Sequence, residues 1–327
     1  MKLAVIGAGK IVHEFLPHAG EIEGLELAAI LDRQASRGKL DELSERYGIR
    51  SVHTDVDECL SDPDVDTVWV AVPNSLHVVF ARKALNAGKN VICEKPFVLR
   101  AEEFAELRAL ASARDLILVE AITTQYLGNY QWICENVGIV GKPELIQSEY
   151  SQYSSRFDAF RAGTVLPAFD PAQGGGALLD IGIYTIHFVV GLWGRPLDVR
   201  YTANVTRGVD TSGVLVLDYG DRTAVCVCAK DSDGPVRSKI QGTDGWILVE
   251  GSPSMVTSVS AGTRGGEIQR IDVNEHSHRM VAEFRAFERM IRDHDTAERD
   301  RRLDHSGAVL DVAIEALKSA HIDVGME

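Results

Sequence analysis

The sequence predicts an α/β protein that consists of a doubly wound parallel sheet followed by an α+β domain with a large, mostly antiparallel sheet. Up to about residue 121, short apolar runs alternate with amphipathic stretches of helical length, which is typical of a parallel sheet covered by helices. Beyond that residue, strand-like runs are separated by turn dipeptides. We therefore predict domains at 1–121 and 122–327, and we allow for a C-terminal helix that packs back on the first domain.

The composition is that of an ordinary globular chain, with 45% hydrophobic and 25% charged residues among 327. A net charge of −14 disfavours binding to nucleic acid or to an anionic membrane. Met1 leads directly into a strand, and we expect no signal peptide and no apolar run that spans a bilayer. Five cysteines in a long chain indicate a reducing, cytoplasmic setting, and Cys226 and Cys228 alternate along a strand so that both thiols face the core.

The first strand, 2–6, ends in a glycine turn that opens a helix, which is the setting of a dinucleotide-binding fingerprint. Gly7 permits the tight turn, and Gly9 lets a pyrophosphate approach the backbone at a helix N-terminus. Lys10 and Ile11 begin the helix and are candidate cofactor contacts. The third glycine of the fingerprint is absent, so a plain strand–helix turn is the alternative.

The second strand, 25–31, runs into Asp32, at about the spacing expected for an acid that binds the adenosine ribose hydroxyls. That carboxylate would repel a 2′-phosphate, which favours NAD. Arg33 and Arg37 follow at once and could accept the phosphate of NADP instead. A helix N-cap is the alternative role for Asp32.

Polar residues also follow the next predicted strand of this domain. The strand 66–72 is followed by Pro73 and Asn74, and His77 lies in the first turn of the next helix, where a capping or solvated histidine is the alternative. The carboxyl ends of strands in an open α/β sheet meet at one edge, where such folds bind ligands.

A short apolar strand, 91–93, is followed directly by Glu94, Lys95 and Pro96. Proline ends the strand, so the carboxylate and the ammonium fall at the same edge as the glycine turn. A surface ion pair that caps the strand is the alternative.

The second domain contains a long irregular stretch, 154–173, with Arg156 and Arg161 among aromatic residues. Loops of this length are often functional, so we consider a substrate loop and a plain surface loop. A glycine triplet then opens a helix, 174–193, on which Asp180 and Tyr184 share a face. His187 lies on or near that face and, with Arg156 and Arg161, is a candidate for substrate contact. A core tyrosine with a first-turn aspartate is the alternative.

The remaining chain predicts an antiparallel sheet whose second face is either solvated or an oligomer interface. We predict the strands at 144–153, 199–205, 214–217, 223–228, 239–241, 246–249 and 267–271. Two helices follow, at 279–293 and 304–320, the second capped by Asp304 or Ser306. The arginines between them, Arg299, Arg301 and Arg302, are predicted to form a solvated linker.

Four segments, 71–77, 84–96, 119–121 and 174–184, together resemble the Gfo/Idh/MocA oxidoreductase family over most of the chain. The resemblance implies that Gly7, Gly9 and Asp32 hold the dinucleotide. It also implies roles at the nicotinamide side and at the substrate for a further set of residues: Asn74, His77 and Glu94 beside the nicotinamide ribose, Lys95 as a catalytic residue, and Asp180 and Tyr184 beside the substrate.

Many members of that family carry histidine at the position of Tyr184. Tyrosine there resembles the subgroup that contains glucose–fructose oxidoreductase, dimeric dihydrodiol dehydrogenase and some xylose dehydrogenases. The resemblance therefore implies a sugar, polyol or trans-dihydrodiol as the substrate, and a homodimer or homotetramer formed through the second sheet.

We expect reversible hydride transfer between nicotinamide and a carbinol, with Tyr184 and Lys95 handling the hydroxyl proton and Asp180 orienting the lysine or a substrate hydroxyl. No metal is predicted, because the histidines and cysteines show no ligand spacing. Three alternatives stay open: a non-catalytic NAD(H) sensor, a relative that recycles tightly bound NAD in non-redox net chemistry, and biliverdin reductase-like chemistry.

Overall fold

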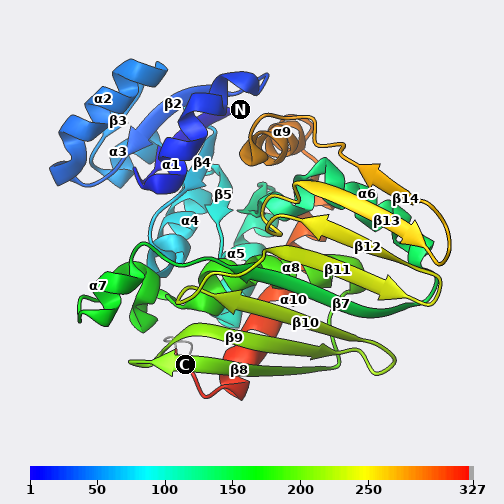
Figure 1. The fold of residues 1–327 in the computed structure, drawn as a ribbon. Helices are drawn as coiled ribbons and strands as arrows, with labels where there is room; N and C mark the ends of the chain where they lie inside the picture. The colour runs from blue at the N-terminus through cyan, green and yellow to red at the C-terminus, as the bar shows by residue number, and fades with distance from the viewer. Residues whose placement is uncertain (324–327) are drawn as a thin grey trace. The chain divides into compact units, whose positions relative to one another are not determined.

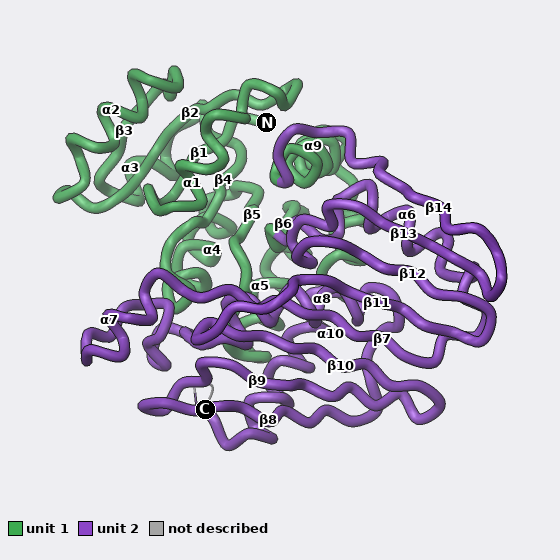
Figure 2. The backbone as a smooth tube through the Cα atoms, in the orientation of Figure 1, with its two compact units in different colours: residues 1–121, 280–304 green, residues 122–279, 305–327 purple. Residues whose placement is uncertain are grey.

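The computed structural model describes residues 1–323, and they form two compact units (Figure 2). Unit 1 combines Met1–Ala121 with Met280–Asp304, and unit 2 combines Ile122–Arg279 with the residues from His305 onward. The sequence predicts residues 280–304 in the domain 122–327, with allowance for a C-terminal helix that packs back on the first domain, whereas the structure groups these residues with unit 1.

Unit 1 is built on a six-stranded, wholly parallel sheet, as the alternating pattern predicted. Its strand order is β3-β2-β1-β4-β5-β6, so the order reverses between β1 and β4, where the glycine turn after β1 lies. The strands are β1 (Lys2–Ile6), β2 (Glu26–Leu31), β3 (Ser51–His53), β4 (Thr67–Val70), β5 (Asn90–Glu94) and β6 (Leu118–Ala121).

Helices connect these strands because each apolar stripe must be buried against the sheet. The connecting helices are α1 (Lys10–Phe15), α2 (Arg37–Tyr47), α3 (Val56–Ser61), α4 (His77–Asn86) and α5 (Ala101–Ala113), and the C-terminal segment adds α9 (Arg279–Arg292) (Figure 1). Helix α9 belongs with this unit because Phe284 stacks on Phe15, with 4.0 Å between ring centroids, and meets Trp69 edge-on at 5.1 Å. This aromatic contact explains why the C-terminal segment 280–304 completes the core of the first unit.

Unit 2 contains an eight-stranded sheet with the order β14-β13-β12-β11-β7-β10-β9-β8. All neighbours are antiparallel except β7 and β10. The strands are β7 (Pro143–Ser151), β8 (Asp198–Thr206), β9 (Val209–Asp218), β10 (Thr223–Ala229), β11 (Arg237–Gly242), β12 (Gly245–Glu250), β13 (Ser258–Thr263) and β14 (Ile268–Ile271).

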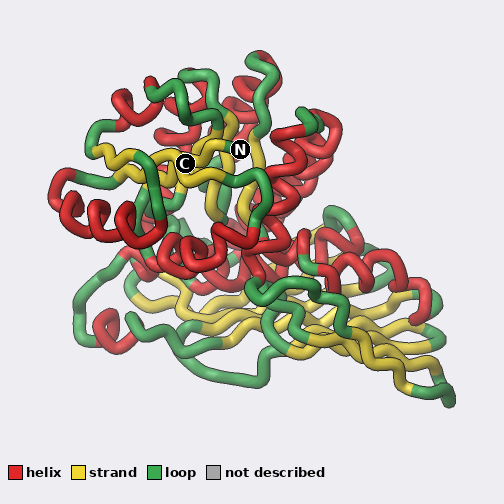
Figure 3. The backbone as a smooth tube through the Cα atoms, turned by 90° about the horizontal axis from the view of Figure 1, so that it is seen from above, coloured by secondary structure: helices red, strands yellow, loops and turns green. Residues whose placement is uncertain are grey.

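The long helices of unit 2 gather on one side of this sheet (Figures 1 and 3). Helix α8 (Ile183–Trp193) packs on β7 and β10, and α10 (Thr296–Ser319), which begins in unit 1, reaches β8, where Ser319 Oγ accepts a hydrogen bond of 2.8 Å from the Tyr201 amide. Helix α6 (Gly128–Asn136), the short α7 (Phe157–Arg161) and a π-helical turn, Leu178–Gly182, complete the helical segments. Short 3₁₀ turns lie at 16–21, 34–36, 74–76, 123–126, 137–140, 167–169 and 171–173.

Several sequence-based expectations are wrong. The helix predicted from residue 304 already begins at Thr296, so Asp304 and Ser306 do not cap it. The predicted linker therefore lies inside α10. Arg299 is only 4% exposed, and its guanidinium donates 3.0 Å to the Leu116 carbonyl and 2.9 Å to Asp300. The stretch 154–173, predicted to be irregular, contains the short helix α7 at residues 157–161.

The expectation that no apolar run could span a bilayer is also too strong. By length and composition alone, the segment Pro171–Trp193 qualifies as one candidate among the described residues. Its most apolar window is 78% buried within the protein, because α8 packs on β7 and β10 of the large sheet. A core helix of a folded domain meets the same criteria.

Candidate functional site

The glycine turn after β1 has the backbone geometry that only glycine accepts easily. Gly7 has a φ of +111°, and a Cβ at this position would lie 2.3 Å from the Ala71 carbonyl oxygen at the end of β4. The Gly7 amide also donates to the Leu31 carbonyl at 2.8 Å. The turn is therefore fixed between the ends of β2 and β4, at the point where the strand order reverses.

Gly9 meets the second requirement of a dinucleotide site, which is open space in front of the backbone. Its φ is −79°, and a Cβ there would have no atom within 4 Å. Gly9 is the N-cap of α1, no side chain caps this end, and the first turn has no acid. The helix therefore begins with the free amides of Lys10 and Ile11, and its dipole favours an anion at this end. This N-terminus fits the pyrophosphate of a dinucleotide.

The end of β2 presents an acid beside several bases. The Asp32 carboxylate accepts a hydrogen bond of 2.7 Å from the Arg33 amide, and the Arg33 guanidinium extends into solvent with 89% exposure of its side chain. Arg37 is engaged with Asp41 at 2.8 Å on the next helical turn. Lys39, which the sequence did not single out, donates 2.6 Å to the Ala8 carbonyl inside the glycine turn. This lysine therefore supports the turn itself.

His77 lies in the interior rather than on the rim. It is 1% exposed, and its ring nitrogens lie 2.9 Å from the Pro96 carbonyl and 3.0 Å from the Val72 carbonyl. Burial lowers the pKa of this imidazole, while its bonds to the Pro96 and Val72 carbonyls act in the opposite direction. His77 thus ties the loop after β4 to the loop after β5. Pro73 and Asn74, by contrast, are at least partly exposed.

The strand β5 ends at a buried carboxylate followed by a partly exposed lysine. Glu94 is the last residue of β5, and the Trp69 indole nitrogen lies 3.3 Å from its Oε1. The next acid along the sheet, Glu120 of β6, accepts 3.0 Å from the Phe97 amide and so holds the chain beyond Lys95. The sequence missed Trp69 and Glu120 because nothing local marks them as partners of this turn. Their effect is to fix the backbone from which Lys95 projects.

In unit 2, Asp180 and Tyr184 lie within one turn of the helical segment, as the spacing predicted. Asp180 belongs to the π-helical turn and is 35% exposed, and Tyr184 is buried on α8, its ring centroid 6.0 Å from that of Tyr150 on β7. The carboxylate of Asp180 pairs with the ammonium of Lys230 at 2.8 Å. Lys95 belongs to unit 1, whereas this group belongs to unit 2.

The glycine triplet before this helix allows a close approach, and the partner is a buried acid. Gly176 has a φ of +131°, and a Cβ there would lie 2.1 Å from Asp210 Oδ1. The other carboxylate oxygen, Oδ2, accepts 2.7 Å from the Leu178 amide and 2.8 Å from the Tyr201 hydroxyl. Burial raises the pKa of Asp210, and its hydrogen bonds counter that effect. Asp210 therefore accepts a hydrogen bond from a backbone amide in the first turn of the helical segment that carries Asp180.

The three residues proposed from sequence for substrate contact lie in different settings. Arg156 and Arg161 are exposed beside α7. His187 is fully buried on α8, with its Nδ1 2.9 Å from His305 Nε2 on α10. The sequence grouped His187 with Asp180 and Tyr184, but the structure directs it to α10.

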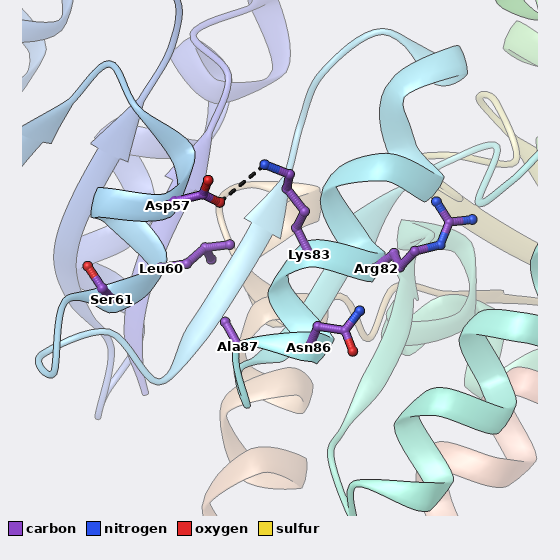
Figure 4. Close-up of a pocket in the computed structure, with 7 residues that line it drawn as sticks. All are labelled: Asp57, Leu60, Ser61, Arg82, Lys83, Asn86 and Ala87. Atoms are coloured by element: carbon purple, nitrogen blue, oxygen red, sulfur yellow. Dashed lines mark hydrogen bonds and ion pairs between the residues drawn. The ribbon is translucent and has the colours of Figure 1, made fainter.

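A surface groove of about 480 Å³ lies between α3 and α4 and is drawn in Figure 4. Lys83 and Asp57 bridge it with an ion pair of 3.1 Å, and Ser61, Asn86 and Ala87 line it near the helix ends that lead back into strands. Helix ends of this kind lie at the amino edge of a parallel sheet, opposite the glycine turn, so we do not assign this groove to the cofactor. Among residues 1–323 no group of three or more His, Cys, Asp and Glu side chains could hold a metal ion.

Comparison with known proteins defines the class. The family described as "Oxidoreductase family, NAD-binding Rossmann fold" matches residues 1–121, and the GFO/IDH/MocA C-terminal domain matches residues 136–248. The protein is an NAD(P)-dependent oxidoreductase that acts on CH–OH groups. It belongs to the Gfo/Idh/MocA family, as the sequence motifs indicated.

Individual relatives cover nearly the whole chain. It is 32% identical to scyllo-inositol 2-dehydrogenase (NADP(+)) IolU of Bacillus subtilis over 98% of both chains. It is 30% identical to trans-1,2-dihydrobenzene-1,2-diol dehydrogenase of Danio rerio over 76% of this chain and 74% of that one. Among solved structures, KijD10, a 3-ketoreductase from Actinomadura kijaniata in complex with NADP and TDP-benzene, has the same fold, with a TM-score of 0.81, 22% identity and coverage of 97% and 98%.

Proposed function

We propose that the protein transfers a hydride reversibly between NAD(P) and the carbinol carbon of a sugar, polyol or trans-dihydrodiol. The observation that carries the proposal is the position of Lys95, which is partly exposed and directly follows β5 at the carboxyl edge where Gly7 and Gly9 form the nucleotide cradle. The names of the inositol and dihydrodiol dehydrogenases among its relatives support the substrate class.

The proposed catalytic residues are Lys95, Asp180 and Tyr184. When bound, the nicotinamide supplies or accepts the hydride. When the substrate is oxidised, its hydroxyl must lose a proton as the hydride leaves. The phenol of Tyr184 would be a weak base at neutral pH, because the ordinary pKa of tyrosine is about 10. An ammonium such as that of Lys95 stabilises a phenolate and also the charge that develops on the substrate oxygen. Asp180 serves as a hydrogen-bond acceptor that orients the lysine or a substrate hydroxyl.

The decisive experiment is a panel of aldoses, inositols and dihydrodiols tested with NAD and NADP by absorbance near 340 nm. Lys95→Met should retain cofactor affinity and lose more than about tenfold in kcat/KM on the best substrate. Lys83→Met, which removes a lysine from the groove between α3 and α4, is the control and should behave as the wild type. A catalytic role for Lys95 is rejected if both variants turn over equally.

We propose that NAD is preferred and that NADP is also accepted. Asp32 would receive the ribose hydroxyls, while the solvent-extended Arg33 could pair with a 2′-phosphate. Asp32→Ala should weaken NAD binding and narrow the preference against NADP. Arg33→Ala should weaken the binding of NADP and leave the binding of NAD unchanged. Unchanged affinities in both variants would remove this pair from the cofactor site.

Two rival functions predict different results in the same assay. A non-catalytic sensor would bind NAD(H) without any substrate-dependent change in absorbance. An enzyme with non-redox net chemistry would retain NAD through purification and release no net NADH.

We also propose self-association, as a homodimer or homotetramer, through the uncovered face of the unit 2 sheet. On that face Val214 and Val216 are 42% and 37% exposed, and Val225 lies directly opposite Val216 in the register. Val216→Asp should shift the mass measured by light scattering toward the monomer, and an unchanged mass would exclude this face. The free cysteines, four of them buried, support our proposal of a reducing, cytoplasmic compartment.

A further inference from the structure

Lys230 is a buried lysine that the proposed chemistry has not yet used. It directly follows β10, its amide donates 2.8 Å to the Thr211 carbonyl, and its own carbonyl accepts 2.9 Å from the Ser154 amide. Its side chain is 3% exposed. Lysine is seldom buried to this degree unless its charge is paired, so the environment of the ammonium should explain its position.

The ammonium of Lys230 is surrounded by acceptors. Its Nζ lies 2.8 Å from Asp180 Oδ2, 2.6 Å from the Ala168 carbonyl and 3.4 Å from the Gly176 carbonyl. It also lies 4.2 Å from the centroid of the Phe169 ring. Carbonyl oxygens can only accept, and an ammonium offers three donors, so these partners suit the charged lysine. The aromatic face adds a further interaction with a cation.

The side chain of Asp180 is 35% exposed, whereas that of Lys230 is 3% exposed. The buried ammonium is therefore paired with a carboxylate that is partly exposed. The neighbouring strands contribute other titratable groups to this helical turn: Tyr150 on β7, Asp210 on β9 and the thiols Cys226 and Cys228 on β10. Burial raises the pKa of both thiols, so they are neutral. Lys230 adds a cation to these groups, at 2.8 Å from the Asp180 carboxylate.

We propose that Lys230 is a positioning residue that keeps Asp180 ionised and correctly oriented, and that couples it to the loop 166–176. An ionised carboxylate can accept hydrogen bonds from a substrate hydroxyl, whereas a protonated one would donate. The carbonyls of Ala168 and Gly176 bind the same ammonium, so the loop and the carboxylate are fixed together. The inference rests on the proposed function, because Asp180 is taken to contact the substrate.

The test follows the protonation of Asp180 directly. Protein labelled with ¹³C at aspartate Cγ is titrated by NMR, and the Asp180 signal is identified by its loss in Asp180→Asn. In the wild type, Asp180 should remain ionised near pH 4, where an ordinary aspartate is about half protonated. In Lys230→Gln, which keeps a donor for the Ala168 carbonyl, the midpoint should rise by about one pH unit or more. Lys239→Gln, on the partly exposed side of β11, is the matched control and should leave the midpoint unchanged.

Kinetics distinguish a positioning role from a merely structural one. On the substrate found for the wild type, the acidic limb of the kcat/KM profile should move upward with the Asp180 midpoint in Lys230→Gln, and cofactor affinity should stay the same. Lys230→Arg should restore the profile in part. Asp180→Asn combined with Lys230→Gln should lose no more activity than Asp180→Asn alone, because the two residues act as one unit.

Equal Asp180 midpoints in the wild type and Lys230→Gln would overturn the inference, and so would a kinetic profile that does not follow the midpoint. If Lys230→Gln does not fold, the wild-type titration decides, and a half-protonated Asp180 near pH 4 counts against the ion pair. If the wild type turns over no substrate with either nucleotide, the proposed function fails while the NMR titration still tests the ion pair.

Discussion

Replacement of the two glycines after β1 by alanine should separate folding from cofactor binding. At Gly7 the positive φ disfavours an L-residue by about 1–2 kcal/mol, and the added Cβ would meet the Ala71 carbonyl oxygen at 2.3 Å. A contact with backbone cannot be relieved by rotating a side chain, and overpacking of this kind typically costs about 1–3 kcal/mol. Gly7→Ala should therefore lower the free energy of unfolding by about 2–5 kcal/mol.

Gly9→Ala is the contrasting variant. Its φ of −79° suits alanine, and the Cβ would have no neighbour within 4 Å, but alanine is a poorer N-cap than glycine, so the stability should stay within about 1 kcal/mol of the wild type. The same Cβ would occupy the space through which a pyrophosphate approaches the backbone, and the affinity for NAD(P) should fall by about tenfold or more, which is about 1.4 kcal/mol.

Urea unfolding followed by circular dichroism and titration of NADH fluorescence measure the two effects. Wild-type stability of Gly7→Ala would refute the strain argument. Undiminished NADH affinity of Gly9→Ala would show that the nucleotide does not approach this turn.

Two further predictions concern buried polar groups. Arg299→Ala should destabilise unit 1 by about 2–3 kcal/mol, because it leaves the Leu116 carbonyl without this donor. The control is Arg301→Ala, which removes an exposed side chain and should change the stability by less than about 0.5 kcal/mol. Urea unfolding midpoints of the two variants make the comparison. Burial raises the pKa of Cys226 to about 12, so at pH 8 its thiolate is scarce; mass spectrometry after iodoacetamide treatment of the folded protein should find the exposed Cys134 alkylated and Cys226 unmodified.

The sequence was most informative where local pattern and tertiary setting agree. The first strand, predicted at 2–6, is β1 with the same bounds, because its apolar run ends directly at the glycine turn. The expectation for Cys226 and Cys228 is also confirmed, since both are buried. The same alternation places residue 230 on that face, so the buried Lys230 could have been anticipated from the pattern.

Other features depend on contacts between distant residues or on very short segments. The three-residue strand β3 is too brief for a pattern, and β13 is built largely of small residues, SVSAGT, that give a weak strand signal. The pairing of Lys230 with Asp180 joins residues 50 positions apart (230 − 180), and no local signal names the partner. The predicted solvent exposure of Arg299 was wrong for a similar reason. A run of charged residues indicates an exposed segment, and the sequence does not reveal that the Leu116 carbonyl is a partner of this arginine.

The stacking of Phe284 on Phe15 has a consequence for synthesis of the chain. A ribosome completes β1 to β6 well before it reaches α9, so the nascent first unit lacks the aromatic ring that covers Phe15 and Trp69. Its core can close only after Phe284 has emerged, which lies 163 residues (284 − 121) beyond the end of β6. The nucleotide-binding half should thus mature late, and a fragment that stops at residue 121 should aggregate rather than fold alone.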